Sequence, residues 1–199
     1  VYAAIKKDMP MDDLVARASV ALRTAISHGV QWFRSHIDID RTARLRLLQG
    51  NVAVRERFQD VIDLQLIAFP QMGMIRDPEV IDLMWQAMEQ GADVVGGMPH
   101  AERDMDDAAR HIELAFQMAR AHDADIDMHI DETDDPAWHS LELLAEETIR
   151  QGWQGRVTAG HCCAMSAWDD AMAERIIAKV AEARINVITI APINLMLQG

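Results

Sequence analysis

The residues best suited to chemistry are a histidine and a glutamate three positions apart, His129 and Glu132, and a second histidine further along, His161. A neutral imidazole binds divalent metals through nitrogen. A carboxylate beside such a metal can move protons to and from water. The pair therefore suggests a metal-assisted hydrolytic site in which His129 is a ligand and Glu132 is the acid/base group. His161 would place a second imidazole on the same ion or the same water.

The same residues also admit a purely structural interpretation. His129 can be a core histidine with satisfied nitrogens, and His161 can bond a backbone carbonyl at the end of a strand. Glu132 can belong to a solvated acidic run. The other members of that run are Asp131, Asp134 and Asp135.

Other polar residues give weaker signals. The amide of Gln71 can pair with two neighbouring polar atoms of a cyclic amide, although an ordinary loop glutamine would look the same. His36 and Asp38 share a strand face, and they either join the site or form a structural hydrogen-bonded pair. The adjacent Cys162 and Cys163 point to opposite sides of a strand end, so they cannot both reach one ion, and we expect them to pack.

Half of the eight histidines stand where predicted strands end. This strand-end group is His36, His100, His129 and His161. The other four, which we expect to be solvated or to cap helices, are His28, His111, His122 and His139.

A regular alternation of strand and helix patterns must position these residues. Short apolar, β-branched runs begin every 30 to 32 residues, and helical patterns fill the intervals between them. The runs begin near Val30, Ile62, Asp93, Asp125, Arg156 and Asn186. The expected helices cover 11–28, 42–60, 78–90, 105–121, 138–151 and 169–183. Pro78 opens one of these helices and Gly91 follows its end, which is the usual asymmetry of helix termini.

Strand–helix units of this length build parallel sheets, either open and doubly wound or closed into a (β/α)8 barrel. No GxGxxG or GxxxxGK[ST] motif follows the first strand, which argues against the nucleotide-binding open sheets. Since a complete barrel needs about 250 residues, we predict an α/β fold of the (β/α)8 TIM-barrel type. Residues 1–199 would form a single, incomplete barrel domain with about strands two to seven, and strands one and eight would lie outside this chain.

Composition narrows the classes of protein further. The 199 residues are 50% hydrophobic and 26% charged, which indicates a soluble globular protein. No apolar run approaches the roughly 18–20 residues of a membrane span, and the first residues are too polar for a signal peptide. Nineteen basic against 32 acidic residues give a net charge of −13, which disfavours nucleic-acid binding. The two adjacent cysteines favour a reducing compartment, and we expect the cytoplasm.

Six strings at strand ends resemble the bacterial cytosine deaminase family of the amidohydrolase superfamily, in order and at the family's spacing. The strings are RSHIDI (34–39), DLQLIAFPQMG (63–73), GADVVGGMPH (91–100), MHIDETDD (128–135), GRVTAGHCCAM (155–165) and INLMLQG (193–199). The resemblance implies the central part of a metal-dependent catalytic barrel.

The resemblance also implies roles for single residues. His129 corresponds to a metal ligand of the family, and Glu132 to the proton shuttle that protonates the substrate's ring nitrogen. His161 corresponds to a strand-end histidine that contacts the metal or steers the attacking hydroxide. Gln71 is similar to the glutamine that pairs with the carbonyl and ring nitrogen of a pyrimidine. One divalent ion (Fe, Zn or Mn) would be the cofactor.

Two departures limit this assignment. The family's HxH ligand pair and a further aspartate ligand would lie outside the chain, and Cys162 and Cys163 replace residues that more often carry hydroxyls. We expect a deaminase that releases ammonia from cytosine or a close ring amidine. The alternatives are an aminohydrolase for N-alkylated triazines, isocytosine or creatinine-like rings, and an inactive barrel fragment. We expect a small nucleobase-like partner, no nucleic acid, no membrane, and a homo-oligomer, because an open barrel exposes two sheet edges.

Overall fold

The computed structural model describes residues 2–197, with side chains from residue 5 onward. Val1, Gln198 and Gly199 lie outside the described residues, and the last two belong to the INLMLQG string. The strands are β1 (Trp32–Asp38), β2 (Asp63–Phe69), β3 (Val94–Gly97), β4 (Asp125–Ile130), β5 (Val157–His161) and β6 (Asn186–Ile188). The α-helices are α1 (Tyr2–Asp8), α2 (Met11–Ser27), α3 (Arg46–Phe58), α4 (Glu79–Glu89), α5 (Met105–His122), α6 (Ser140–Gln151), α7 (Asp170–Glu182) and α8 (Ala191–Leu197). Two short 3₁₀ helices, η1 (Pro99–Ala101) and η2 (Cys163–Ala167), follow β3 and β5.

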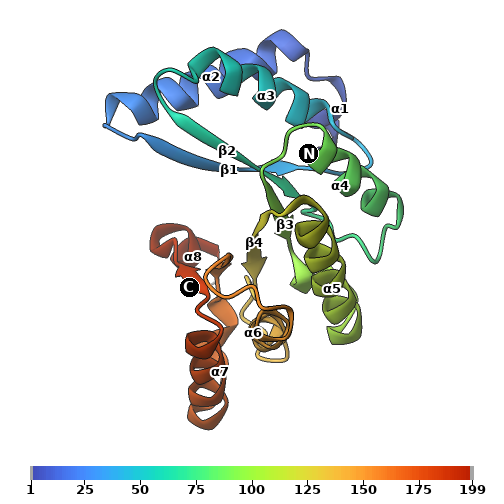
Figure 1. Ribbon diagram of the computed structural model, residues 1–199, viewed down its shortest axis with the longest axis vertical. Coiled ribbons are helices and arrows are strands. Elements are labelled where there is room, and N and C mark those ends of the chain that lie inside the picture. The colour runs from blue at the N-terminus through green and yellow to red at the C-terminus, as the bar shows by residue number, and fades with distance from the viewer. Residues whose placement is uncertain (1, 198–199) are drawn as a thin grey trace.

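The six strands form one parallel sheet whose spatial order, β1-β2-β3-β4-β5-β6, is the order of the sequence. The sheet curls, and helices run along its outer side (Figure 1). This arrangement confirms the predicted α/β fold with a parallel sheet, and the curled half-barrel matches part of a TIM-type barrel. Closure into eight strands stays a prediction.

The core lies between the sheet and its helices. Alternate residues of the strands face outward and are buried there, as the two-residue period of a strand requires. Examples are Leu64 and Leu66 on β2 and Ile126 and Met128 on β4, against Phe116 on α5. Burying each such side chain contributes about 1.5–3 kcal/mol, so this layer is what holds the strand ends in place.

Close strand contact explains why β3 is rich in glycine. A Cβ atom on Gly96 would lie 2.4 Å from the carbonyl oxygen of Ala68 on β2. On Gly97 it would lie 2.8 Å from the sulfur of Met128 on β4. Only a residue without a side chain permits these approaches, so the GG pair fixes the spacing of β2, β3 and β4.

The concave side of the sheet carries polar residues and remains open. On it, Arg34 of β1 donates from Nη1 to Oδ2 of Asp127 of β4 at 2.9 Å, and from Nε to Oε1 of Gln65 at 2.9 Å. The two outer strands are exposed: Trp32 on β1 is 73% exposed and Val187 on β6 is 51% exposed. No helix within residues 2–197 is long and apolar enough to cross a membrane.

One expectation about histidines is wrong. His111, expected to be solvated or to cap a helix, is fully buried on α5. Its Nδ1 lies 2.7 Å from Oε1 of Glu102, and its Nε2 accepts the backbone N–H of Met98 at 3.2 Å. A carboxylate and a backbone amide thus satisfy both ring nitrogens, which is how a histidine can be buried inside a helix layer.

Candidate metal and catalytic centre

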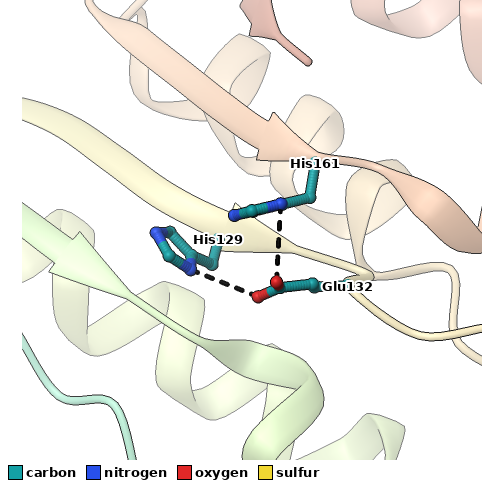
Figure 2. A group of neighbouring side chains, drawn as sticks. All are labelled: His129, Glu132 and His161. Atoms are coloured by element: carbon teal, nitrogen blue, oxygen red, sulfur yellow. Dashed lines mark ion pairs between the residues drawn. The ribbon is translucent and has the colours of Figure 1, made fainter. Parts of the chain in front are cut away.

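His129, Glu132 and His161 meet at the carboxyl ends of β4 and β5 (Figure 2). One oxygen of Glu132 lies 3.3 Å from Nδ1 of His129, and the other lies 3.5 Å from Nδ1 of His161. The two imidazole rings are 4.5 Å apart between centroids. The side chains of His129 and Glu132 are 22% and 13% exposed, so the group is partly open to solvent.

The loop after β4 is held by Asp131, which stands beside Glu132. The Asp131 carboxylate accepts hydrogen bonds from the Ser140 hydroxyl and amide and from the Leu141 amide, all at the start of α6. Asp131 is fully buried and has a left-handed backbone with φ of 47°. Its assignment to a solvated acidic run is therefore wrong: Asp131 caps a helix, and the chain turns there to direct Glu132 to the strand edge.

His161 is placed by an unusual backbone at the end of β5. It pairs in register with Ile130, whose side chain is buried in the core, so strand alternation alone would direct His161 to the same side. His161 has a φ of 71° and Cys162 a φ of 53°, both in the left-handed region. The alternating direction of the side chains along β5 therefore breaks at His161, and its ring faces His129. Nδ1 of His161 lies 2.8 Å from Oδ1 of Asn194 on α8.

Two further rings surround His129. The centroids of His36 on β1 and Phe69 on β2 each lie 4.5 Å from that of His129. Nε2 of His36 is 3.4 Å from an oxygen of Asp127, while Asp38 forms an ion pair with Lys6. His36 and Asp38 therefore have different partners, and His36 belongs to the wall around His129.

The environment favours an ionised Glu132. The hydrogen bond from His129 lowers the pKa of this carboxyl more than its partial burial raises it, and the charge of His161 lowers it further. At neutral pH Glu132 is thus a carboxylate that can accept a proton. Since the Asn194 amide oxygen can only accept, Nδ1 of His161 is the donor in this contact.

The three side chains fit a divalent metal. Their ligand atoms all lie within 4.8 Å of one another, and they are two nitrogens and one oxygen. Ligands about 2.1 Å from one zinc or iron ion lie roughly 3–4 Å apart, so small side-chain movements suffice. His129 and His161 would hold the ion, with Glu132 beside it.

The structure places Gln71 in a separate surface pocket. Gln71 lies two residues beyond β2, is exposed, and lines a pocket of about 590 Å³. That pocket is also lined by Lys6, Asp40, Arg41, Thr42, Met72, Arg76, Asp77 and Val80. Phe69, at the end of the same strand, does contact His129. Gln71 is thus near the strand edge but is not part of the group in Figure 2.

The first of the two cysteines after His161 behaves as a packing residue. Cys162 is 8% exposed and belongs to the hydrophobic core. Burial, followed by the charge of Asp131, raises the pKa of the Cys162 thiol to about 12, so it is protonated at neutral pH. A protonated thiol is a poor metal ligand, which agrees with the expected role.

Comparisons with known proteins identify relatives. A scan against models of protein families finds no match. The chain is 34% identical over 136 residues to N-isopropylammelide isopropyl amidohydrolase of Pseudomonas sp. (strain ADP), covering 68% of this chain and 34% of that protein. It is 33% identical over 187 residues to pterin deaminase of Rhizobium rhizogenes, covering 94% of this chain and 42% of that protein. The structure of 5-methylcytosine deaminase from Klebsiella pneumoniae with 5-fluorocytosine matches with a TM-score of 0.90 and 36% identity, covering 94% of this chain and 45% of that chain.

A parallel half-barrel with histidines and a carboxylate at its strand ends is the architecture of barrel-type metal-dependent hydrolases. With these relatives, the chain belongs to the amidohydrolase superfamily, in the group that contains the cytosine deaminases. The chain spans between 34% and 45% of the length of the relatives described above.

Proposed function

We propose that the protein is a metal-dependent hydrolytic deaminase that acts on cytosine or a close ring amidine and releases ammonia. The observation that carries this proposal is the position of Glu132, whose two oxygens each face the imidazole of a different strand-end histidine. A carboxylate held this way serves both as acceptor and as donor of a proton. That is the requirement of hydrolytic deamination, in which water loses a proton and the substrate ring gains one.

Each residue has a distinct part in this reaction. A divalent ion (Fe, Zn or Mn) held by His129 and His161 supplies Lewis-acid activation of water. Glu132 takes the proton of the attacking water and transfers it to the ring nitrogen beside the amino-bearing carbon, which makes that carbon electrophilic. His161 stabilises the charge that develops as the tetrahedral centre forms. Glu132 then takes the proton of the hydroxyl on the tetrahedral carbon and gives it to the leaving amine, so that ammonia departs as the carbonyl forms.

Gln71 would recognise the substrate. Its amide offers one donor and one acceptor, which match the carbonyl and ring nitrogen of a pyrimidine. In the structure it lies outside the His129–Glu132–His161 group, so this role requires the loop after β2 to bring its side chain toward the ring.

A second set of substrates follows from the relatives. One is an N-isopropylammelide isopropyl amidohydrolase and another a pterin deaminase, which favours N-alkylated triazines and pterins as alternatives to cytosine. Isocytosine and creatinine-like rings are further alternatives, because they carry the same ring amidine. All present an amino-bearing carbon beside a ring nitrogen. The same catalytic residues would therefore serve any of them, and the substrate-binding loops would select among them.

A substrate panel with matched variants tests the proposal. Release of ammonia, or of the alkylamine in the case of an N-alkylated triazine, is measured for the metal-loaded full-length protein with cytosine, isocytosine, an N-alkylated triazine, creatinine and pterin. We expect one ring to be turned over by the wild type, and Glu132→Gln to lower kcat by about 10²–10⁴ with metal content unchanged. Asp134→Asn, an exposed acid two residues away, is the control and should keep full activity. Full activity of the Gln variant, or no turnover of any ring, contradicts the proposal.

The remaining expectations belong to the same proposal. The ligand would be a small nucleobase-like molecule, and the protein would bind neither nucleic acid nor membranes. The protein would be a homo-oligomer in the cytoplasm. The single incomplete barrel domain over residues 1–199 also stays a proposal. Sedimentation equilibrium of the full-length protein measures the oligomeric state directly, and a monomer would contradict this part.

A further inference from the structure

His100 is a histidine with two buried and unused ring nitrogens. It lies on η1, directly after β3. Both Nδ1 and Nε2 are buried and have no hydrogen-bond partner among the described residues. Proteins rarely leave buried polar atoms unpaired, and each case calls for a structural or functional explanation.

The position of His100 suggests the explanation. β3 is the neighbour of β4 in the sheet, so the segment that follows β3 lies at the same strand edge as His129. Burial lowers the pKa of His100 to about 4, and the nearest charges that act on it include Glu132, His129 and His161. At neutral pH the ring is therefore uncharged, with one donor nitrogen and one acceptor nitrogen beside the candidate centre.

A buried pair of residues fixes the backbone on both sides of His100. His111 accepts the amide N–H of Met98, two residues before it, and contacts Glu102, two residues after it. The side chains of His111 and Glu102 are both 0% exposed. Because both anchors are internal to the fold, the His100 ring is presented from a rigid turn.

The same carboxylate reaches the loop that carries Gln71. Glu102 accepts the backbone amides of Met74, Ile75 and Arg76 at 2.7 to 3.0 Å. Gly73 comes so close that a Cβ there would lie 2.8 Å from the Glu102 carboxylate. One buried group thus sets the relative positions of His100 and of the loop after β2.

We infer that His100 contacts the substrate directly, pairing its donor and acceptor nitrogens with the polar edge of a planar ring amide or amidine. This inference rests on the proposed function and extends it, since it adds a specificity-determining residue on η1 to the catalytic residues at the ends of β4 and β5. It also gives the ring nitrogens of His100 partners that the described residues do not supply.

Two substitutions separate substrate contact from a structural role. His100→Phe fills the same space without polar atoms, and His100→Asn keeps a donor and an acceptor. In the metal-loaded full-length protein we expect His100→Phe to raise KM at least tenfold and to change kcat less than threefold. It should also weaken binding of uracil, the deaminated product of cytosine, at least tenfold by calorimetry. His100→Asn should recover part of both losses, and His28→Phe, at an exposed histidine, should change neither.

Metal analysis and melting curves accompany each variant. Unchanged KM and unchanged uracil affinity in His100→Phe would overturn the inference, and so would a loss of bound metal, because His100 would then support the ion instead. If His100→Phe does not fold, the smaller His100→Leu carries the same test. If the wild type neither binds uracil nor deaminates any ring of the panel, the proposed function has failed and the inference fails with it. A wild type that is active while His100→Phe is unaffected refutes the inference alone.

Discussion

The carboxylate of Asp131 accepts a hydrogen bond from the hydroxyl of Ser140 at 2.6 Å, and both side chains are fully buried. The same carboxylate accepts the amides of Ser140 and Leu141. Asp131 also belongs to the loop that carries Glu132, so the first turn of α6 and the candidate catalytic carboxylate are fixed by one residue. The backbone carbonyl of Asp131 further accepts the amide of Ala164, which joins the loops after β4 and β5.

Asp131→Ala should therefore be strongly destabilising. It removes a helix cap, worth about 0.5–2 kcal/mol, and leaves buried N–H groups unpaired at about 1–3 kcal/mol each. We expect the free energy of unfolding in urea to fall by about 2–4 kcal/mol. Ser140→Ala keeps two of the three hydrogen bonds and should cost about 1 kcal/mol. Equal losses in the two variants would show that Asp131 is not the centre of this network.

Removal of the first imidazole should weaken metal binding. His129 is the histidine of the group that approaches Glu132 most closely, so His129→Ala leaves a single histidine near the carboxylate. We expect metal affinity, measured by titration with Zn²⁺ after chelation, to fall by roughly 10–100-fold or more. His139→Ala is the control, since His139 bonds only the nearby carbonyl of Ala137 among the described residues. Retained metal in His129→Ala would place the ion elsewhere.

An ion-pair network between α6 and α7 should make stability depend on pH. Glu142 accepts both Nε and Nη2 of Arg175 at 2.9 Å, and Nζ of Lys179 at 2.7 Å. The hydrogen bond from Arg175 contributes most to lowering the pKa of Glu142 to about 2. Because this pKa is below its ordinary value, the stabilisation is complete above the unfolded pKa of about 4.3 and is lost as the pH falls through 2.

Glu142→Gln tests this dependence. At pH 7 the variant should be less stable by about 0.5–1 kcal/mol, since the partners are partly exposed and screened by solvent. The difference from the wild type should shrink below pH 4.3 and vanish near pH 2, as followed by urea unfolding at several pH values. A difference that stays constant over this range would assign the loss to packing.

The close approach of β2 and β3 should make Gly96 intolerant of a side chain. A methyl group there would meet the carbonyl oxygen of Ala68 at 2.4 Å, and backbone cannot move aside cheaply. We expect Gly96→Ala to lower the free energy of unfolding by about 1–3 kcal/mol. Gly160 on β5 is the matched control, because its nearest contact would be an ordinary 3.5 Å. Comparable melting temperatures for Gly96→Ala and the wild type would contradict this account.

Much of the fold could be predicted because the spacing of apolar residues along strands and helices follows which side chains are buried. Gly91, expected to follow the end of a helix, does so with a φ of 107° just after α4. The short helix α1 was not predicted, since its position depends on distant contacts. Lys6 on α1 forms ion pairs with Asp38 and Asp40, more than thirty residues away, and no local pattern encodes them.

The candidate site was predictable where it is local. His129 and Glu132 are three positions apart, so their proximity follows from the sequence, and the pairing of β4 with β5 brings in His161. The buried pair of Glu102 and His111 could not be predicted, because a polar residue in an amphipathic helix is normally solvated. Its only sequence signal is an acid placed after a strand end and a histidine nine residues later.

The order of the strands has a consequence for how the chain folds. Each strand pairs with the strand that precedes it in the sequence, so its partner has already been synthesised about thirty residues earlier. Closing a shorter loop costs less conformational entropy than closing a longer one. The sheet can therefore grow one strand–helix unit at a time as the chain leaves the ribosome. The bond from Arg34 to Asp127, which spans 93 residues, would form only once four strands are in place. It would form late in folding, and only if the sheet curls enough to bring β1 and β4 together.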